Sequence, residues 1–248
     1  MYSGKNAFSL DMPEEFMTVH PDSLAKKLLL SFRAILNGVL AFIMFGIPLF
    51  IPAGTIKFPN AWLFLGIFII CYVTFLIYFS FTNPRYAQTR YRAAESETAQ
   101  KVAMGLLIAS ALTMLLVAGL DFRFQWSHVP LLAVTGFSVI MVLSLVMLFF
   151  VMKQNSYTSR VIEIQEDQQL IDTGTYGVVR HPMYLAFAVL FLSAPFVLGS
   201  WFAIFPALCI PFILSIRIRN EEYVLRKGLR GYEAYTQKVR YRLIPFVW

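Results

Sequence analysis

Four long apolar runs constrain the fold of this chain more than any other feature of its sequence. They cover Leu28–Ile51, Trp62–Phe81, Val102–Leu120 and Leu131–Met152. A helix needs about 20 apolar residues to cross the roughly 30 Å hydrocarbon core of a bilayer, and each run is close to that length. A hydrophobic fraction of 58% with only 14% charged residues is also far from the composition of a soluble protein. The sequence therefore predicts an integral membrane protein.

A fifth apolar stretch, Tyr184–Ile218, is too long for one span and short for two. It is interrupted at Pro195, Gly199, Pro206 and Pro211. This pattern favours a tight hairpin of two tilted or broken helices. We therefore predict an all-α polytopic bundle of about six spans, divided into a lead at 1–27, four transmembrane helices at 28–153 and a C-terminal region at 154–248.

The basic residues lie mainly on one side of the predicted spans. The opposite side carries only Lys57 and Arg123. The basic residues at and after the end of the hairpin are Arg217, Arg219, Arg226, Lys227, Arg230, Lys238, Arg240 and Arg242. By the positive-inside rule, both termini and the loop before the hairpin face the cytoplasm. Orientation and contact with anionic lipid headgroups account for the net charge of +7, so we expect the lipid bilayer, and not nucleic acid, as a partner.

The cysteines and the N-terminal sequence argue against three features: a disulfide, a metal site and a cleavable signal peptide. Cys71 and Cys209 lie inside apolar stretches, far from a second thiol or a histidine at metal-ligand spacing, so neither a disulfide nor a metal site is expected. Residues 1–27 are polar and include acidic side chains, which is unlike a cleavable signal peptide. Glycines in the first and third runs would permit helix association, but the sequence predicts no particular oligomeric state.

A polar motif, GTYGVVRHPMY at Gly174–Tyr184, leads directly into the apolar hairpin. Pro182 suits the first turn of a helix, because its missing N–H would have no partner there. Arg180 and His181 precede it at the mouth of a hydrophobic segment. A charged group at such a place is costly unless something polar or anionic uses it, so the motif predicts a functional site.

After the hairpin, the acidic pair Glu221 and Glu222 falls in a segment expected to form an amphipathic helix. The apolar stripe of that helix would consist of Ile218, Tyr223, Leu225 and Leu229. Two simpler interpretations stay open. The acidic pair suits a solvated helix start, where carboxylates favour the helix dipole, and Arg180 suits an anchor that only sets orientation.

In this order and spacing, the elements resemble the isoprenylcysteine carboxyl methyltransferase and phospholipid methyltransferase superfamily, over roughly 155–248. The shared pattern G-x-Y-x-x-x-R-H-P-x-Y is formed by Gly174, Tyr176, Arg180, His181, Pro182 and Tyr184. It is followed by a helical hairpin and by E-E-x-x-L, formed by Glu221, Glu222 and Leu225. The pair Tyr232 and Tyr235 and a final R-L-I-P complete the match.

The resemblance implies an integral-membrane transferase that uses S-adenosylmethionine without a Rossmann domain and makes 154–248 its catalytic region. No strand followed by G-x-G-x-x-G is recognisable in the sequence, which agrees with this expectation. The cofactor would lie between the R-H-P loop and the C-terminal segment. The cofactor-binding residues implied are Tyr176, His181, Tyr184, Glu221, Glu222, Leu225 and Tyr235.

The chemistry of S-adenosylmethionine suits these residue types. Glu221 or Glu222 can accept hydrogen bonds from its amino group, and His181 or a nearby backbone N–H can bind its carboxylate. The rings available to its sulfonium belong to Tyr176, Tyr184 and Tyr235. Methyl transfer is an in-line displacement, for which positioning supplies much of the rate. Arg180 and Arg240 are the predicted catalytic residues, since a guanidinium can hold a carboxylate or thiolate acceptor near the methyl group.

The acceptor expected is apolar or amphipathic and enters from the bilayer: a prenylated cysteine carboxylate, a lipid, or a thiol. Two alternatives remain open. Some sterol reductases look similar in the same C-terminal region, which suggests an NADPH-dependent membrane reductase of a sterol-like lipid. The chain could instead be a non-catalytic membrane scaffold that keeps the same architecture.

Overall fold

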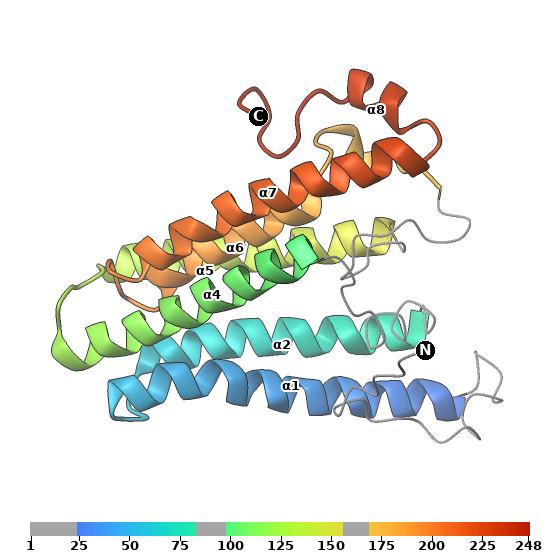
Figure 1. Ribbon diagram of the computed structural model, residues 1–248. Helices are drawn as coiled ribbons and strands as arrows, with labels where there is room; N and C mark the ends of the chain where they lie inside the picture. Colours follow the sequence, from blue (N-terminus) through green and yellow to red (C-terminus); the bar gives the residue numbers. More distant parts are fainter. Residues whose placement is uncertain (1–23, 83–97, 156–168) are drawn as a thin grey trace, which may run out of the picture.

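The computed structural model describes residues 24–82, 98–155 and 169–248, and these residues form helices and loops without a β-strand (Figure 1). The helices are α1 (Leu24–Ala53), α2 (Pro59–Thr82), α4 (Thr98–Phe124), α5 (Leu131–Gln154), α6 (Pro182–Val197), α7 (Ile204–Gly228) and α8 (Tyr232–Lys238). A short 3-10 turn occupies Gly174–Gly177. Most of the N-terminal lead, and of the loop between α5 and this turn, lies outside the described residues.

Four helices, α1, α2, α4 and α5, are long and apolar enough to cross a membrane. They contain the four runs recognised in the sequence, so these four predicted spans are confirmed as membrane-spanning candidates. Helix α6 has 16 residues, which corresponds to about 24 Å and is less than the usual hydrocarbon thickness. The structure therefore supports four of the roughly six predicted spans by length and composition.

The long helices run side by side with alternating direction (Figure 1). Helix α1 packs against α2 and α4, α4 packs against α7, and α5 packs against α6. The connections between α1 and α2, α4 and α5, and α6 and α7 gather at one end of the bundle, which we call the far end. Helix α6 begins and α7 ends at the opposite end, which we call the site end.

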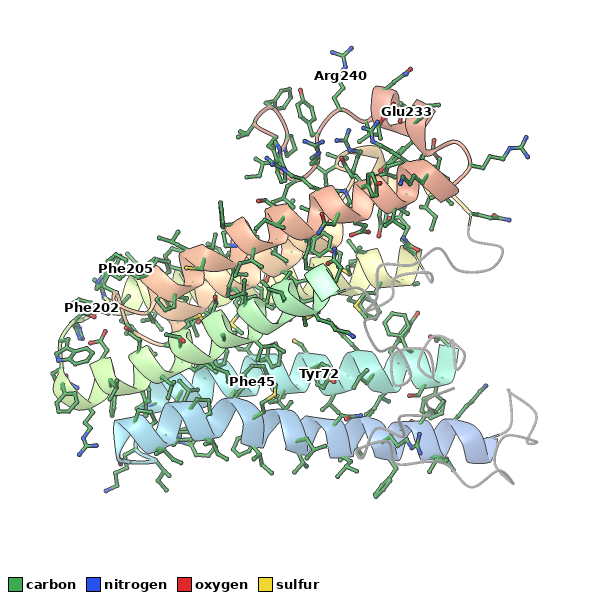
Figure 2. All side chains as sticks on the ribbon, viewed as in Figure 1. Phe45, Tyr72, Phe202, Phe205, Glu233 and Arg240 are labelled. Carbon is green, nitrogen blue, oxygen red and sulfur yellow. The ribbon has the colours of Figure 1, made fainter. Side chains whose placement is uncertain are left out.

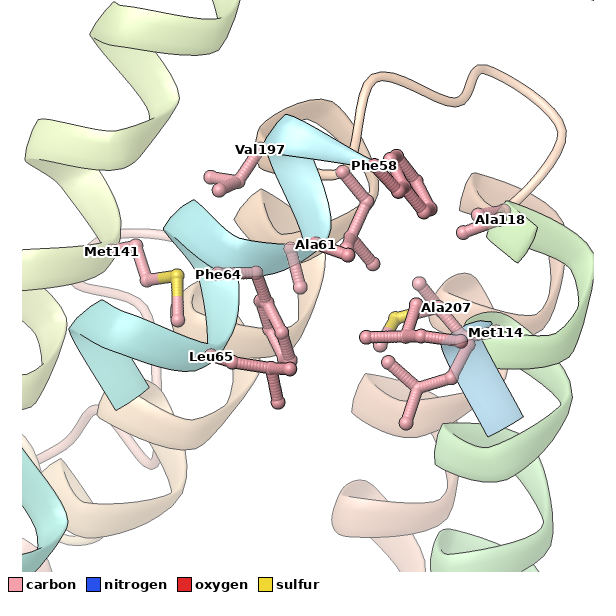
Figure 3. Close-up of a cluster of buried hydrophobic side chains, with 14 of the residues drawn as sticks. Phe58, Ala61, Phe64, Leu65, Met114, Ala118, Met141, Val197 and Ala207 are labelled. Carbon is pink, nitrogen blue, oxygen red and sulfur yellow. The ribbon is translucent and has the colours of Figure 1, made fainter. Parts of the chain in front are cut away.

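The core between the helices is densely apolar in the half near the far end. The side chains that meet there include Phe58, Phe64, Leu65, Met114, Met141 and Val197 (Figure 3). Helices α1 and α4 approach closely at Gly119, where a β-carbon would lie 2.5 Å from the main-chain oxygen of Leu49. Small residues at such crossings are typical of membrane helices, since packing holds them together in place of a hydrophobic driving force.

The helical hairpin expected after the R-H-P loop is present, but its second helix differs from the prediction. Helix α7 is continuous to Gly228, so a separate amphipathic helix after the hairpin was a wrong expectation. Between Pro211 and Gly228 the sequence contains neither proline nor glycine, and nothing interrupts the helix. Tyr223, assigned to the apolar stripe, is 61% exposed. The acidic pair therefore lies in the last third of a long helix and not at a helix start.

Candidate functional site

The loop before α6 is fixed to the end of α5. The side-chain oxygen of Gln154 accepts hydrogen bonds from the backbone N–H and the hydroxyl of Thr175, at 3.2 and 2.8 Å. Gly174 has a φ of +54°, and a β-carbon there would lie 2.5 Å from the Gln154 amide nitrogen. The left-handed conformation favours glycine, and a larger residue would have to displace the Gln154 amide group. Asn155 donates a hydrogen bond to the Tyr176 hydroxyl at 3.1 Å.

The C-terminal segment after α8 pairs with the R-H-P loop through the main chain. The backbone N–H of Arg180 donates to the oxygen of Tyr241, and that of His181 donates to the oxygen of Arg242, both at 2.9 Å. Pro182 then begins α6, as the sequence predicts. These two hydrogen bonds place the last residues of the chain against the start of α6.

Glu222 of α7 is the centre of the polar groups brought together here. It receives the Nε–H of Arg180 on one carboxylate oxygen at 2.8 Å and the Nε–H of Arg242 on the other at 2.9 Å. The Nε2 atom of His181 lies 3.4 Å from the same oxygen as Arg180. Arg180, His181 and Glu222 are each less than 9% exposed. We call Arg180, His181, Glu222 and Arg242 the Glu222 cluster.

Arg180 also holds the C-terminal segment in place. Its Nη1 atom donates to the main-chain oxygens of Thr236, Val239 and Arg240, at 3.3, 3.0 and 3.3 Å. A planar guanidinium can make several directed bonds of this kind at once, which a lysine cannot. Arg180 therefore connects the R-H-P loop, α7 and the end of α8.

The Glu222 carboxylate is ionised over the whole physiological range. Burial opposes ionisation, but the interaction with His181, the hydrogen bond from Arg242 and the charge of Arg180 outweigh it and lower the pKa of Glu222 from 4.5 to about 2. An opposite charge at hydrogen-bonding distance has this effect because it stabilises the charged form. The cluster thus combines one buried anion with two guanidinium groups.

In and next to this cluster, three buried polar atoms make no hydrogen bond of good geometry: Oε2 of Glu221, the hydroxyl of Tyr232, and Nε2 of His181, whose contact with Glu222 is an ion-pair approach at 3.4 Å. Such atoms are rare in folded proteins, and an unmade hydrogen bond costs about 1–3 kcal/mol. The His181 ring lies between the two carboxylates, with Nδ1 3.9 Å from Oε2 of Glu221 and Nε2 3.4 Å from Glu222. Buried orphaned groups beside a charged cluster are typical of a ligand site.

Aromatic side chains complete the surroundings. The Tyr235 hydroxyl donates to the main-chain oxygen of Tyr176 at 2.7 Å, and the rings of Tyr232 and Tyr235 are 5.7 Å apart. Burial, followed by the charge of Glu222, raises the pKa of Tyr232, so its hydroxyl stays protonated. The ring centroid of Tyr184 is 5.8 Å from that of His181. Leu225 packs against the small apolar cluster of Leu229, Tyr232, Tyr235 and Val239.

The structure brings most of the predicted site residues together, with one clear exception. The Arg240 side chain is exposed and points away from the cluster (Figure 2). Arg242, two residues later, makes the contact with Glu222 instead. The burial of Glu222 removes the alternative of a solvated position for that residue, whereas the Glu221 side chain is 25% exposed.

Sequence reasoning did not select Arg242 or Arg217 as site residues. Arg217 is 3% exposed and, together with Glu221, interacts with the hydroxyl of Tyr184. The sequence does contain a signal for Arg217, which precedes Glu221 by four residues and therefore shares its face of α7. A signal for Arg242 was also present, since it is the arginine of the final R-L-I-P that completes the family resemblance. Among the described residues there is no group of three or more His, Cys, Asp or Glu side chains that could hold a metal ion.

Comparisons with known proteins locate this region within a family. Residues 135–227, from α5 to the acidic pair, match the Isoprenylcysteine carboxyl methyltransferase (ICMT) family. A stretch of 84 residues is 36% identical to the Delta(14)-sterol reductase TM7SF2 of Mus musculus, and covers 33% of this chain but only 20% of that protein. Over residues 135–227, the chain is thus similar to the isoprenylcysteine carboxyl methyltransferase family.

Proposed function

We propose that this protein transfers a methyl group from S-adenosylmethionine to an apolar or amphipathic acceptor at the membrane. The observation that carries the proposal is the set of buried, orphaned polar atoms beside the Glu222 cluster. The large majority of buried polar groups in folded proteins are hydrogen-bonded, so several unpaired ones at one place call for a ligand or another explanation. The family match over the same residues supports the reaction class.

The residues present fit this cofactor. The orphaned Oε2 of Glu221 offers an acceptor to a charged amino group, and the orphaned His181 nitrogen and Tyr232 hydroxyl offer polar contacts to a carboxylate. The tyrosine rings near them offer aromatic surface to a sulfonium or an adenine. Tyr176 and Tyr235 would border the site, and Leu225 would support it from the small apolar cluster.

When bound, the cofactor supplies an electrophilic methyl group, which bonds to the acceptor nucleophile as its bond to sulfur breaks, leaving S-adenosylhomocysteine. The contribution of the chain is alignment of the two reactants, which can provide a large part of the rate. Because the donors of Arg180 already contact Glu222 and three main-chain oxygens, we assign it the role of a positioning residue. An acceptor anchored by Arg240 would need that exposed side chain to turn inward.

The acceptor is proposed to enter from the bilayer. Helix α6 begins directly after His181 and continues as sixteen predominantly apolar residues, so the site borders the apolar part of the molecule. We place this end of the bundle in the cytoplasm on the basis of its excess of lysine and arginine, and we propose that the α6–α7 hairpin also crosses the membrane. Isoprenylcysteine carboxylates, lipid amines and thiols all suit this geometry.

A second candidate function is reduction of a sterol-like lipid with NADPH. One observation favours it, the 36% identity to a sterol reductase over 84 residues. The two functions differ in the cofactor that the protein binds.

Calorimetric titration of the purified protein with S-adenosylhomocysteine, and separately with NADPH, tests both functions. We expect saturable binding of S-adenosylhomocysteine by the wild type and by Glu233→Gln, a change at an exposed acidic residue of α8. We expect much weaker binding by Glu221→Gln and by His181→Ala in protein that elutes as a single folded species. Binding of NADPH in its place would replace the proposal with the reductase, and binding of neither would favour the scaffold.

A further inference from the structure

The last residues of the chain form a compact apolar loop whose outward-facing side chains are exposed, although the ring of Phe246 lies 5.2 Å from that of Tyr241. Residues 243–248 turn back from α8 alongside α7 and do not extend away from the bundle (Figure 1). We call them the 243–248 loop. Its outward side chains are Ile244, Phe246 and Val247, which are 45%, 89% and 76% exposed. Phe246 is among the most exposed large apolar side chains described.

The depth of this loop along the bundle is defined by what its inward side chains contact. Leu243 and Trp248 belong to the apolar cluster that includes Leu214 of α7 and Leu107 of α4. Leu107 is seven residues inside the candidate span Gln100–Phe124, which corresponds to roughly 10 Å from the start of that span. The loop therefore lies beside the membrane-spanning part of the molecule and not beyond it.

The exposed face of α7 indicates the same depth. An apolar stripe of Phe205, Leu208, Phe212 and Ile216 runs along it at helical spacing, and each is at least 42% exposed. The next turn carries the exposed Arg219. Such a change from apolar to basic is typical of the boundary between hydrocarbon and headgroups. The cluster that holds Leu243 and Trp248 contains Ile210 and Leu214, which lie on the apolar side of that boundary.

Most N–H groups of the loop backbone, with Phe246 as the exception, are hydrogen-bonded within the loop. The main-chain oxygen of Trp248 accepts hydrogen bonds from the N–H groups of Arg242, Leu243 and Ile244, at 2.9, 3.0 and 3.2 Å. The N–H groups of Val247 and Trp248 in turn donate to the oxygen of Ile244, and Pro245 has no N–H. Irregular backbone is tolerated at membrane depth only when its polar groups are satisfied within the protein.

We propose that the 243–248 loop is inserted into the bilayer, with Ile244, Phe246 and Val247 among the acyl chains of the adjacent leaflet. Arg240 just before the loop and Arg219 of α7, both exposed, provide the positive charge that anionic headgroups attract. The same segment carries the main-chain oxygens that receive the N–H groups of Arg180 and His181. The bilayer thus contacts an element that directly borders the Glu222 cluster.

Fluorescence quenching in lipid nanodiscs tests this insertion without using any cofactor, so its outcome is independent of the proposed reaction. In a Cys71→Ala, Cys209→Ala background, single cysteines at Val247→Cys, Phe212→Cys and Gln237→Cys carry an environment-sensitive fluorophore. Phe212 lies on the apolar stripe of α7, and Gln237 is an exposed polar residue of α8. Phe246→Cys serves as a second loop position if the first variant does not fold.

We expect the label at residue 247 to be quenched by acyl-chain spin-labelled lipid as strongly as the label at 212, and to resist iodide in the buffer. The label at 237 should show the opposite behaviour. Quenching of the loop label by iodide, as at 237, would overturn the proposal in favour of an aqueous loop. Protection from both quenchers would overturn it in favour of a protein partner or a second copy of the chain.

Discussion

Two buried carboxylates at opposite ends of the bundle differ in their hydrogen-bonding partners and in how completely the polar groups around them are paired. At the far end, Asp121 accepts hydrogen bonds from the N–H and hydroxyl of Ser127, at 2.8 and 2.6 Å, and from the hydroxyl of Ser200. At the site end, Glu222 is held by two arginines and lies next to a histidine. Both carboxylates are almost fully buried.

The difference lies in what remains unsatisfied. No side-chain atom of Asp121, Ser127 or Ser200 is among the orphaned buried atoms of the described residues, whereas Glu221, His181 and Tyr232 each contribute one at the other end. Asp121 joins the α4–α5 loop to the α6–α7 loop, and Ser127 also receives the N–H of Trp201. A fully bonded network rigidifies a fold, and a partly bonded one leaves groups for a ligand. The comparison predicts that mutations at the two carboxylates have different effects: at the far end on stability alone, and at the site end also on ligand binding.

The largest effect is expected from Glu222→Ala. It leaves Arg180 buried without its counter-ion, and breaking such a pair costs about 3–5 kcal/mol of unfolding free energy. Binding of S-adenosylhomocysteine should also be lost. Glu233→Ala, which removes an exposed ion pair with Arg226, should cost at most about 1 kcal/mol in the same unfolding assay. Equal losses in the two variants would contradict the central role of Glu222.

The contribution of ionised Glu222 to the free energy of unfolding should also depend on pH. The pKa of Glu222 is lower in the folded protein than in the unfolded chain, so this carboxylate stabilises the fold fully above pH 4.5 and progressively less as the pH falls towards 2. The difference in thermal unfolding midpoint between wild type and Glu222→Gln should therefore shrink across this window. A difference that stays constant from pH 5 to pH 2 would argue against an ionised, paired Glu222.

Glu221→Gln should affect ligand binding more than folding. Its Oε2 atom has no hydrogen-bond partner in the protein, so the fold loses little. A hydrogen bond to a charged group contributes about 1.5–3 kcal/mol, which corresponds to roughly ten- to hundredfold weaker binding of S-adenosylhomocysteine. Calorimetry and an unfolding curve on the same preparation distinguish the two effects. Destabilisation with unchanged affinity would reverse the roles assigned to Glu221 and Glu222.

Asp121→Ala should affect folding more than ligand binding. It removes the acceptor of the N–H and O–H groups of Ser127 and of the O–H group of Ser200, which costs about 1–3 kcal/mol of unfolding free energy. The affinity for S-adenosylhomocysteine should stay within twofold of the wild type, because the site lies at the other end of the bundle. Loss of binding in a folded Asp121→Ala protein would show that the two ends are coupled.

The smallest effect is expected from Arg240→Ala. Its exposed side chain contacts no part of the Glu222 cluster, so stability should change by no more than about 0.5 kcal/mol and ligand affinity should be unchanged. Arg242→Ala, which removes a hydrogen bond to Glu222, is the matched comparison and should weaken both. A stronger effect of Arg240→Ala than of Arg242→Ala on ligand affinity would support the sequence-based prediction that Arg240 is a catalytic residue.

The sequence by itself determined features that depend on local composition. The four apolar runs identify their helices because crossing a bilayer requires a certain apolar length. Pro182 marks the start of α6, since a proline fits the first turn of a helix and not its interior. The family motif selected Arg180, His181, Glu221 and Glu222, which the fold brings together although 42 residues separate Arg180 from Glu222.

Tertiary structure alone decided which groups complete each cluster. Arg242 opens the R-L-I-P motif, but the path of the backbone after α8 is what directs Arg242 towards Glu222 and Arg240 outwards. Ser200 reaches Asp121 across 79 residues because the α4–α5 and α6–α7 loops meet at the far end. Contacts of this kind depend on how whole helices pack, and no local propensity encodes them.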